Sequence, residues 1–527
     1  WIKNAVKLGR AESCDDVLES PDRARNLSQQ ILEASELFLA VMETAFRYRE
    51  EHLTLYGLSE DFVEDGVLSD GYETLPEFWT SRGVGYTEAG KLLDLELDSR
   101  RSWNSANLSG ADFPDAQVLN QTAANSARHL RVLGQMHQER TRWLSAQGDP
   151  KLVDESSLLE HMHVENRKWH LFKLAGVGHL QDALRLAESF RDMDALVELI
   201  VELQDQKKNG PVQGSSEGAP TSADQLDPAQ LISTYFDKFG DIWADAYFFH
   251  RIKFGYPGTL LAMRKYQPAV TRFLRKTPAY SRLSWINDVT GEDDYDTAAA
   301  SLENLALNSE KDLWSHRVEI SLAKLSKLAT QERMHPQVQP SLALQGDVKR
   351  LEDYIEVDGI QDTLYEHLRP VWEGAIDRKA EAELALECYG GHLLEDRPSL
   401  REILSDTLST LVNRQVVSVD DLVDLLTLIG PVQHAENGDD EVVRSEFHLA
   451  LRVLDHGRYG QRDSSYLAAL QRLIWRRCMI KDDWVARGKA AEGSNGDSVS
   501  SISDTSLCRT LNACLEEGEC SQPLWVM

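Results

Sequence analysis

The chain has 527 residues, a formal net charge of −30 and an apolar fraction of 42%. This length allows several domains or one long repeat array, and the apolar fraction is ordinary for a globular protein. The negative charge argues against direct binding to nucleic acid or to an anionic membrane, because both require Lys and Arg to neutralise phosphate. The chain begins at Trp1 rather than Met, so we expect a piece of a longer protein.

The first 203 residues show helical periodicity. Apolar side chains recur at steps of three and four residues and form one stripe: Ile31, Ala34, Phe38, Met42 and Ala45. Further along, the segment His179–Leu203 predicts two antiparallel helices that break near Arg191-Asp192. A hairpin of this kind cannot bury its apolar face alone, so such units stack. We therefore predict an N-terminal helical block over 1–203.

The polar segment 204–223 is rich in Gly, Ser and Pro and predicts a disordered linker. A central aromatic-rich block over 224–330 follows it. Asp227-Pro228 and Thr277-Pro278 each place a capping residue before a proline at a helix start. Aromatic side chains at helical spacing predict a core rather than nucleobase stacking: Tyr235, Phe236, Phe239, Trp243, Tyr247, Phe248 and Phe249. A second apolar stripe is predicted at Trp314, Val318, Leu322, Leu325 and Ala329.

A C-terminal helical block is predicted over 331–527, with flexible loops near 435–441 and 486–503 and a short strand at Gln415–Val419. The first part of this block is unusually rich in apolar residues. Leu, Tyr and Trp anchors suit the centre of a protein interface, although they could equally pack only within their own block. The candidate partner-binding residues are Leu351, Tyr354, Ile355, Ile360, Leu364, Leu368, Val371 and Trp372.

Two short motifs resemble catalytic or metal-binding sequences. The run Asp420–Asp424 reads DDLVD, which in all-helical terpene synthases binds magnesium and a substrate diphosphate. Ser418 followed by Asp421 is also a helix-capping pair, which we consider the stronger interpretation. His161 and His163 diverge on a helix and cannot share one metal. We therefore predict no catalytic residue, no metal site and no cofactor.

Cysteine usage is sparse, and the spacing of the residues fits neither a disulfide framework nor a zinc site. We predict free thiols in a reducing compartment, the cytoplasm or nucleus, at Cys14, Cys388, Cys478, Cys508, Cys514 and Cys520.

Four segments, in this order and spacing, resemble the C-terminal α-helical domain of the nucleoporin 133 family, within the nucleoporin 133/155-like group and of fungal type. They are Leu186–Leu199, Thr234–Phe249, Phe273–Val289 with its Leu283-Ser284-Trp285-Ile286 run, and the pair Leu302–Leu307 and Glu319–Ala329. Weaker likeness continues through Asp421–Gly430, Ala450–Gly457 and Ser506–Gly518.

The resemblance implies an all-α fold, an elongated and irregular α-solenoid-like stack of helical hairpins. It also implies a structural scaffold of the Y-shaped outer-ring coat of the nuclear pore, at the nuclear envelope. The C-terminal block would bind the helical tail of nucleoporin 107 (84 in yeasts) tail to tail and would contact other coat subunits indirectly. The implied roles are in pore assembly and in transport, including mRNA export and protein import. Direct contact with nucleic acid or membrane is not implied for this fragment.

Two alternatives remain open from the residues. One is an α-solenoid adaptor of another membrane-coat or tethering complex. The remote one is an all-α diphosphate-binding enzyme that uses Asp420, Asp421 and Asp424.

Overall fold

The computed structural model describes residues 21–56, 63–64, 66–105, 116–209, 226–334, 341–391, 397–429, 446–457, 464–482, 484 and 505–517. Over these residues the regular structure is helical apart from one short hairpin, which confirms the all-α prediction. The chain forms two compact units, Trp1–Leu260 (unit 1) and Leu261–Met527 (unit 2). The boundary between them falls inside the predicted block 224–330. None of the described helices is long and apolar enough to cross a membrane.

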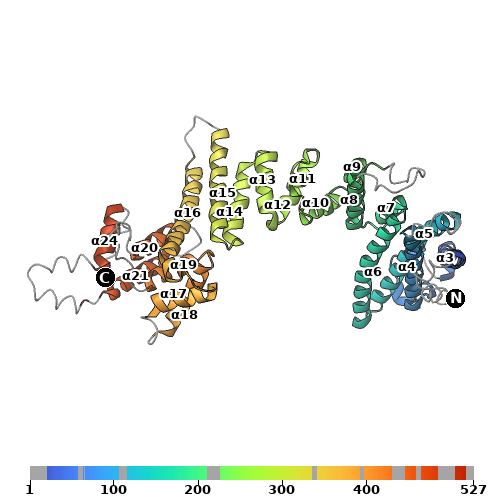
Figure 1. Ribbon diagram of the computed structural model, residues 1–527, viewed down its shortest axis with the longest axis horizontal. Coiled ribbons are helices and arrows are strands. Elements are labelled where there is room, and N and C mark those ends of the chain that lie inside the picture. The colour runs from blue at the N-terminus through green and yellow to red at the C-terminus, as the bar shows by residue number, and fades with distance from the viewer. Residues whose placement is uncertain are drawn as a thin grey trace, which may run out of the picture. The chain divides into compact units, whose positions relative to one another are not determined.

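Unit 1 runs from α3 to α10 (Figure 1). Its longer helices are α3 (Pro21–Glu51), α4 (Gly83–Ser105), α5 (Ala116–Ala146), α6 (Pro150–Gly176), α7 (Leu180–Ser189), α8 (Met193–Asn209), α9 (Pro228–Phe239) and α10 (Asp241–Lys253). Between α3 and α4 lie the 3₁₀ turns η1 (Leu53–Tyr56), η3 (Tyr72–Thr74) and η4 (Trp79–Ser81) and the antiparallel strands β1 (Val63–Glu64) and β2 (Val67–Leu68).

Helix α5 is the centre of the first part of unit 1, because α3, α4 and α6 all pack against it. The apolar stripe predicted for α3 is buried at Ile31, Ala34, Phe38 and Met42, and Ala45 is half-buried. This prediction is therefore confirmed. The stripe meets apolar side chains of α5 such as Leu119.

A buried ion pair also joins α3 to α5. One Arg49 nitrogen lies 2.6 Å from Glu139, and both side chains are almost fully buried. Thr80 of η4 accepts a hydrogen bond from Arg49 and donates one to Glu139. The Arg49 guanidinium also lies 4.1 Å from the centre of the Phe78 ring. Because each charge has a charged partner and further contacts, this interior position is tolerated.

The predicted hairpin is present as α7 and α8. The chain turns at Arg191, whose φ of 51° lies in the left-handed region. Asp192 then caps α8 by accepting a hydrogen bond from the backbone of Ala195. The break near Arg191-Asp192 is confirmed, and α8 continues to Asn209, into the segment predicted as a linker. Residues 210–225 lie outside the described residues.

Helices α9 and α10 carry the predicted aromatic core. Asp227 caps α9, and Pro228 occupies its first turn, as expected. Five of the seven aromatic side chains are buried, Phe239 is intermediate and Phe249 is exposed. Trp243 packs against Tyr235 and Tyr247 at ring-centre distances of 5.1 and 5.8 Å. The core prediction is thus confirmed for most of the set.

Unit 2 begins at the last residue of α11 (Pro257–Leu261). Its elements are η5 (Arg264–Tyr266), α12 (Gln267–Lys276), η6 (Pro278–Tyr280), α13 (Ser281–Asn287), the π-helical turn η7 (Asp288–Glu292), α14 (Tyr295–Asn308), α15 (Leu313–Met334), α16 (Leu342–Leu368), η8 (Arg369–Val371), α17 (Arg378–Gly390), α18 (Pro398–Val412), α19 (Val419–Leu428), α20 (Glu446–His456), α21 (Ser464–Lys481) and α24 (Ser506–Glu517). From α12 to α16 each helix packs on the next.

The stripe predicted for α15 is wrong about which face is buried. Trp314 is 70% exposed and Leu325 is 60% exposed, whereas Leu313, Ile320 and Ala323 are buried. The reason is that α15 packs between α14 and α16. Small residues such as Ala323 allow that close contact, and the large side chains point away.

The strand predicted at Gln415–Val419 does not form. Gln415 makes one isolated bridge with Asp312, and α19 begins at Val419. Residues 435–441 and 486–503, and Cys14 and Cys520, lie outside the described residues. The other four cysteines are free thiols.

Candidate partner-binding surface

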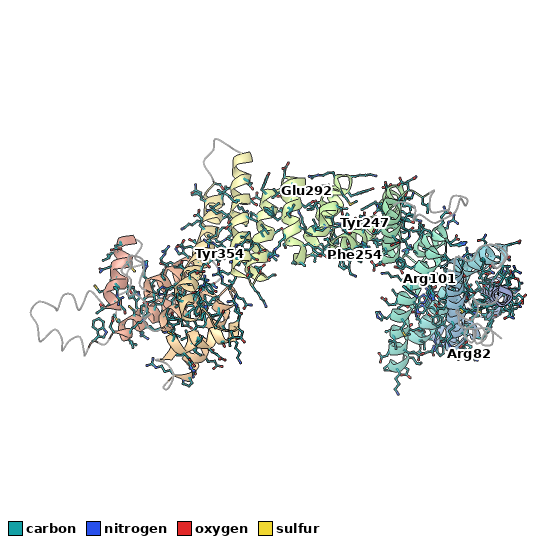
Figure 2. The ribbon with its side chains drawn as sticks, viewed as in Figure 1. Arg82, Arg101, Tyr247, Phe254, Glu292 and Tyr354 are labelled. Atoms are coloured by element: carbon teal, nitrogen blue, oxygen red, sulfur yellow. The ribbon has the colours of Figure 1, made fainter. Side chains whose placement is uncertain are left out.

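The eight candidate residues lie on α16 and just after it, and they belong to two separate cores. Leu351 is buried in a cluster with α14 and α15, and Tyr354 (labelled in Figure 2) and Ile355 pack against that cluster. Ile360, Leu364, Leu368 and Trp372 are buried in a larger cluster, against which Val371 packs. Their side chains therefore lie inside unit 2.

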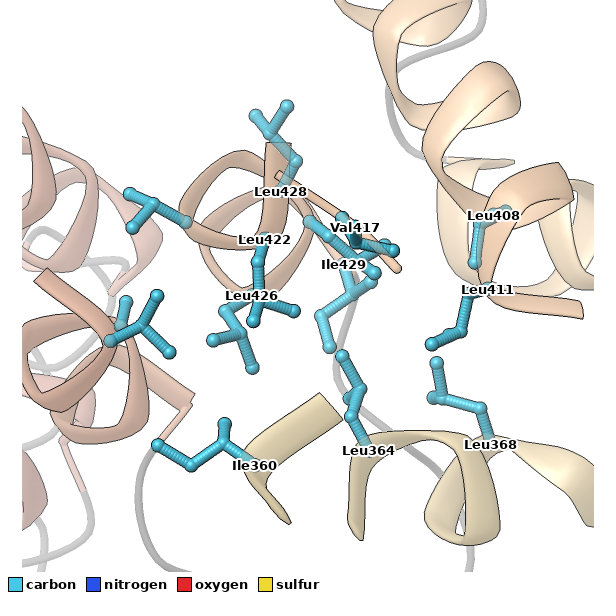
Figure 3. Close-up of a cluster of buried hydrophobic side chains, with 14 of the residues drawn as sticks. Ile360, Leu364, Leu368, Leu408, Leu411, Val417, Leu422, Leu426, Leu428 and Ile429 are labelled. Carbon is cyan, nitrogen blue, oxygen red and sulfur yellow. The ribbon is translucent and has the colours of Figure 1, made fainter. Parts of the chain in front are cut away.

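The larger cluster forms the core of the second half of unit 2. In Figure 3, Ile360, Leu364 and Leu368 of α16 face leucines of α18 and α19. Helices α20, α21 and α24 complete it through residues such as Phe447, Ile474 and Cys514. Burial raises the pKa of the Cys478 thiol in this cluster to about 11. This thiol is therefore protonated at neutral pH, which makes it a poor nucleophile.

Polar contacts fix α16 in its place. The Nδ1 atom of His316 in α15 lies 2.8 Å from a carboxylate oxygen of Asp358, and both residues are buried. Burial raises the pKa of Asp358, although the histidine contact opposes this. Gln361 donates to the carbonyl of Gln415 and accepts from the backbone of Val417 at 3.0 Å. Backbone groups of Gln415 and Val417 are thus hydrogen-bonded to a side chain of α16 and not to a neighbouring strand.

The acidic run at the start of α19 is occupied by structural contacts. The Ser418 side chain accepts a hydrogen bond from the backbone of Asp421, so the predicted capping pair is confirmed. Asp424 forms an ion pair with Arg477 of α21 at 2.5 Å. Asp420 accepts a hydrogen bond from Tyr466 at 3.2 Å. Each of the three carboxylates thus has a structural partner.

The histidines of the HMHVE run separate as predicted. His161 is exposed, whereas His163 is buried and stacks on His137 with ring centres 3.7 Å apart. Burial is the main cause that lowers the pKa of His137 to about 4 and of His163 to about 2. Both rings are neutral at physiological pH. Among the described residues no group of three His, Cys, Asp or Glu side chains could hold a metal ion.

The solvent side of α21 is a second candidate surface, outside the residues predicted from the sequence. Ala469, Arg472, Arg476 and Ile480 are exposed at steps of three or four residues and therefore form one line, which we call the α21 face. Ile480 is 74% exposed. Helix α21 has four basic residues and no acidic residue, although the chain carries a charge of −30. On the neighbouring α24, Leu515 is also exposed.

A signal for this surface was present in the sequence. The segment Ser464–Lys481 has apolar residues on more than one face, while the basic residues are the only charges. A helix of that kind buries one face and presents a mixed apolar and basic face elsewhere. The candidate residues on α16 are more densely apolar than α21, but in the structure most of them are buried in the core of unit 2.

The helices and their contacts define the class of protein. Buried apolar faces join successive helices, and the charged side chains that resemble a catalytic motif serve to cap or connect helices. This is an all-α helical scaffold.

The comparisons with known proteins then give the family. The model of a family described as "Non-repetitive/WGA-negative nucleoporin C-terminal" matches residues 2–524. The chain therefore belongs to this nucleoporin family, which confirms the resemblance found in the sequence.

Three relatives agree with this assignment. Nucleoporin NUP133 of Chaetomium thermophilum is 26% identical over 503 residues, which are 94% of this chain and 35% of the relative. Nucleoporin nup132 of Schizosaccharomyces pombe is 24% identical, with 90% of this chain and 38% of the relative covered. Nuclear pore complex protein Nup133 of Danio rerio is 25% identical over 59% of this chain and 24% of the relative. The chain thus matches only 24–38% of the length of these three relatives.

Proposed function

We propose that this chain is a structural, non-enzymatic scaffold segment of the nuclear pore complex and that it acts at the nuclear envelope. The family match over residues 2–524 is the observation that carries this proposal. The names of the relatives, two nucleoporins and a nuclear pore complex protein, support the location. The same membership favours a nucleoporin over an adaptor of another coat or tethering complex.

We further propose that unit 2 binds the helical tail of a nucleoporin 107-type protein (84 in yeasts) within the Y-shaped outer-ring coat. Through this contact the chain supports pore assembly and transport, including mRNA export and protein import. A permanent contact of this kind buries on the order of 2,000 Å² or more, around an apolar centre. Other coat subunits are then reached indirectly.

The α21 face is our preferred position for the centre of that contact. Its Ile480 is an apolar side chain that no other part of the described chain covers. Arg472 and Arg476 lie beside it on the same exposed line, and both are free of ion pairs with other described residues. An acidic amphipathic helix would cover Ile480 and neutralise both arginines.

The candidate residues on α16 contribute indirectly under this proposal. Leu351, Ile360, Leu364, Leu368 and Trp372 are buried, so a charge placed there would disrupt the unit before it tested binding. Ile360, Leu364, Leu368 and Trp372 share one core with α21 and α24, the helices that present the surface, whereas Leu351 packs with α14 and α15. A direct partner contact by Tyr354, Ile355 and Val371, which are only partly buried, stays a prediction.

Isothermal titration calorimetry of the whole chain with a purified nucleoporin 107-type tail tests the proposal. Ile480→Glu and Arg476→Glu should each weaken binding at least tenfold, which is about 1.4 kcal/mol. Leu325→Glu is the matched control, because it places the same charge at an exposed apolar site of unit 2, on α15. Equal affinity of all three variants and the original chain would place the contact elsewhere. No binding by the original chain would refute the proposed partner.

A further inference from the structure

Helices α4 and α6 of unit 1 border a groove that no described part of the chain fills. The groove has a volume of about 680 Å³. Residues of α4 line one side at helical spacing, from Gly83 through Tyr86, Gly90 and Asp94 to Asp98. At 1.5 Å per residue this side is about 22 Å long.

The opposite side of the groove is one face of α6, from Glu155 to Lys173, about 27 Å long. Leu133 of α5 lies in the lining between the two helices. Two parallel helix faces of this length match a single helix of about five turns. The groove dimensions therefore favour a helix over a small molecule.

The α4 side of the groove has free space at Gly90. A side-chain carbon added at Gly90 would meet nothing within 4 Å. Glycine inside a helix costs roughly 1 kcal/mol relative to alanine, so its presence there calls for a compensating role. Close approach of a second backbone is such a role.

The α6 side presents large apolar side chains to solvent. Met162 is 51% exposed and Trp169 is 55% exposed, and Leu158 is exposed one turn before Met162. Together with Glu165 they recur at steps of four, three and four residues, so they form one line along the helix. Exposed Trp and Met side chains in one groove are typical anchors for a partner.

The charges inside the groove are neutralised by one another. Lys173 lies 3.0 Å from Asp94 and 2.8 Å from Asp98. Although burial opposes it, hydrogen bonds from His170 and Lys173 lower the pKa of Asp94 to about 2, so this carboxylate is ionised and engaged. Arg140 lies 2.8 Å from both Glu77 and Glu155. None of these groups is left to attract a charged ligand.

Glu165 of α6 does not line the groove itself but lies beside two residues that do, Met162 and Trp169. This exposed carboxylate has no ion pair or hydrogen bond with another described residue. It lies between Met162 and Trp169 on the apolar line, where a bound helix would cover it in part. His170 offers a second unmet contact: it is 5% exposed and lines the groove, and its Nδ1 atom has no hydrogen-bond partner among the described residues.

We propose that the α4–α6 groove is a docking site for an amphipathic helix of another protein, one whose apolar stripe is flanked by arginine or lysine. The stripe packs on Met162 and Trp169, and a flanking cation pairs with Glu165. The site lies in unit 1 and is separate from the surface of unit 2 to which the proposed function assigns the nucleoporin tail.

The probe is a synthetic helical peptide of about 18 residues, matched to the groove length, with leucines at steps of four and three and arginines beside them. A second peptide carries glutamate in place of each arginine, and a third has the leucines scrambled. Fluorescence anisotropy with the labelled peptides and the whole chain should show at least tenfold tighter binding of the arginine peptide than of either other peptide.

Variants of the chain locate the binding. Glu165→Lys should weaken binding of the arginine peptide at least tenfold and strengthen that of the glutamate peptide, and Trp169→Ala should weaken both. Glu50→Lys on α3 and Trp314→Ala on α15 are matched controls at exposed sites, and they should change nothing. Circular dichroism confirms that each variant is folded.

Three results would overturn the proposal. The first is equal binding of all peptides, or binding of none. The second is full binding by a folded Trp169→Ala chain. The third is concentration-dependent dimerisation in analytical ultracentrifugation that Trp169→Ala abolishes, which would show that the occupant is a second copy of this chain.

Discussion

Truncating Leu364 to alanine separates a core role from a direct binding role for α16. The side chain is 4% exposed and lies among Leu368, Leu411 and Ile429 (Figure 3). Leu364→Ala removes three carbon atoms from this core, which costs about 2.4 kcal/mol at roughly 0.8 kcal/mol each. The cavity that remains raises the loss of unfolding free energy of unit 2 to about 3–4 kcal/mol. Leu325→Ala is the matched control, because it removes the same three carbon atoms from a side chain that is already 60% exposed.

Hydrogen–deuterium exchange of the whole chain measures this difference locally. Since each 1.4 kcal/mol is a factor of ten, amides of α16 and α19 should exchange about 100-fold faster or more in Leu364→Ala. The control should stay within a factor of about two, as expected for a surface site below roughly 0.5 kcal/mol. Exchange in unit 1 should be unchanged in both variants. Equal exchange rates in Leu364→Ala and the original chain would refute the burial of Leu364. The α16 residues would then again be candidates for direct partner binding.

Three further predictions follow from charged groups. Arg49→Met should destabilise unit 1 by about 3–5 kcal/mol in urea unfolding, because Glu139 stays buried without its cation; an unchanged midpoint would contradict the buried pair. Burial lowers the pKa of His163 to about 2, so below about pH 6.5 the unfolded chain binds more protons than the folded chain, and unit 1 should lose stability as the pH falls. His163→Gln should therefore make the melting temperature depend less on pH between pH 7 and 5, and an equally steep dependence in the variant would refute this. Asp424→Asn should cost about 1 kcal/mol, more than an ordinary surface change, since it weakens the half-buried pair with Arg477; a melting temperature raised by magnesium in the original chain would instead support a metal role for this run.

The sequence was sufficient for features that depend on local chemistry. The cap at Asp227, the break at Arg191 and the capping pair at Ser418 each follow from residue types within one turn, and the structure has all three. The aromatic core of α9 and α10 was equally predictable, because large apolar rings at helical spacing need burial in a polar chain.

The sequence was insufficient where several helices compete for one face. Trp314 points to solvent although it heads an apolar stripe, because α15 buries its small residues between two neighbouring helices. The apolar density of α16 was compatible with a partner surface and with a core of its own block, and six later helices (α17 to α21 and α24) share one core with its buried residues. Which of two apolar faces becomes the core depends on packing partners distant in the chain, and periodicity contains no information about those partners.

The most direct test of the proposed scaffold role is a hydrogen–deuterium exchange footprint of the whole chain in complex with a nucleoporin 107-type tail. We expect stable binding and slowed exchange in α21 and α24, at residues 464–481 and 506–517, with little change in α3 to α6. A footprint confined to unit 1, or the absence of a complex, would contradict a tail contact through unit 2.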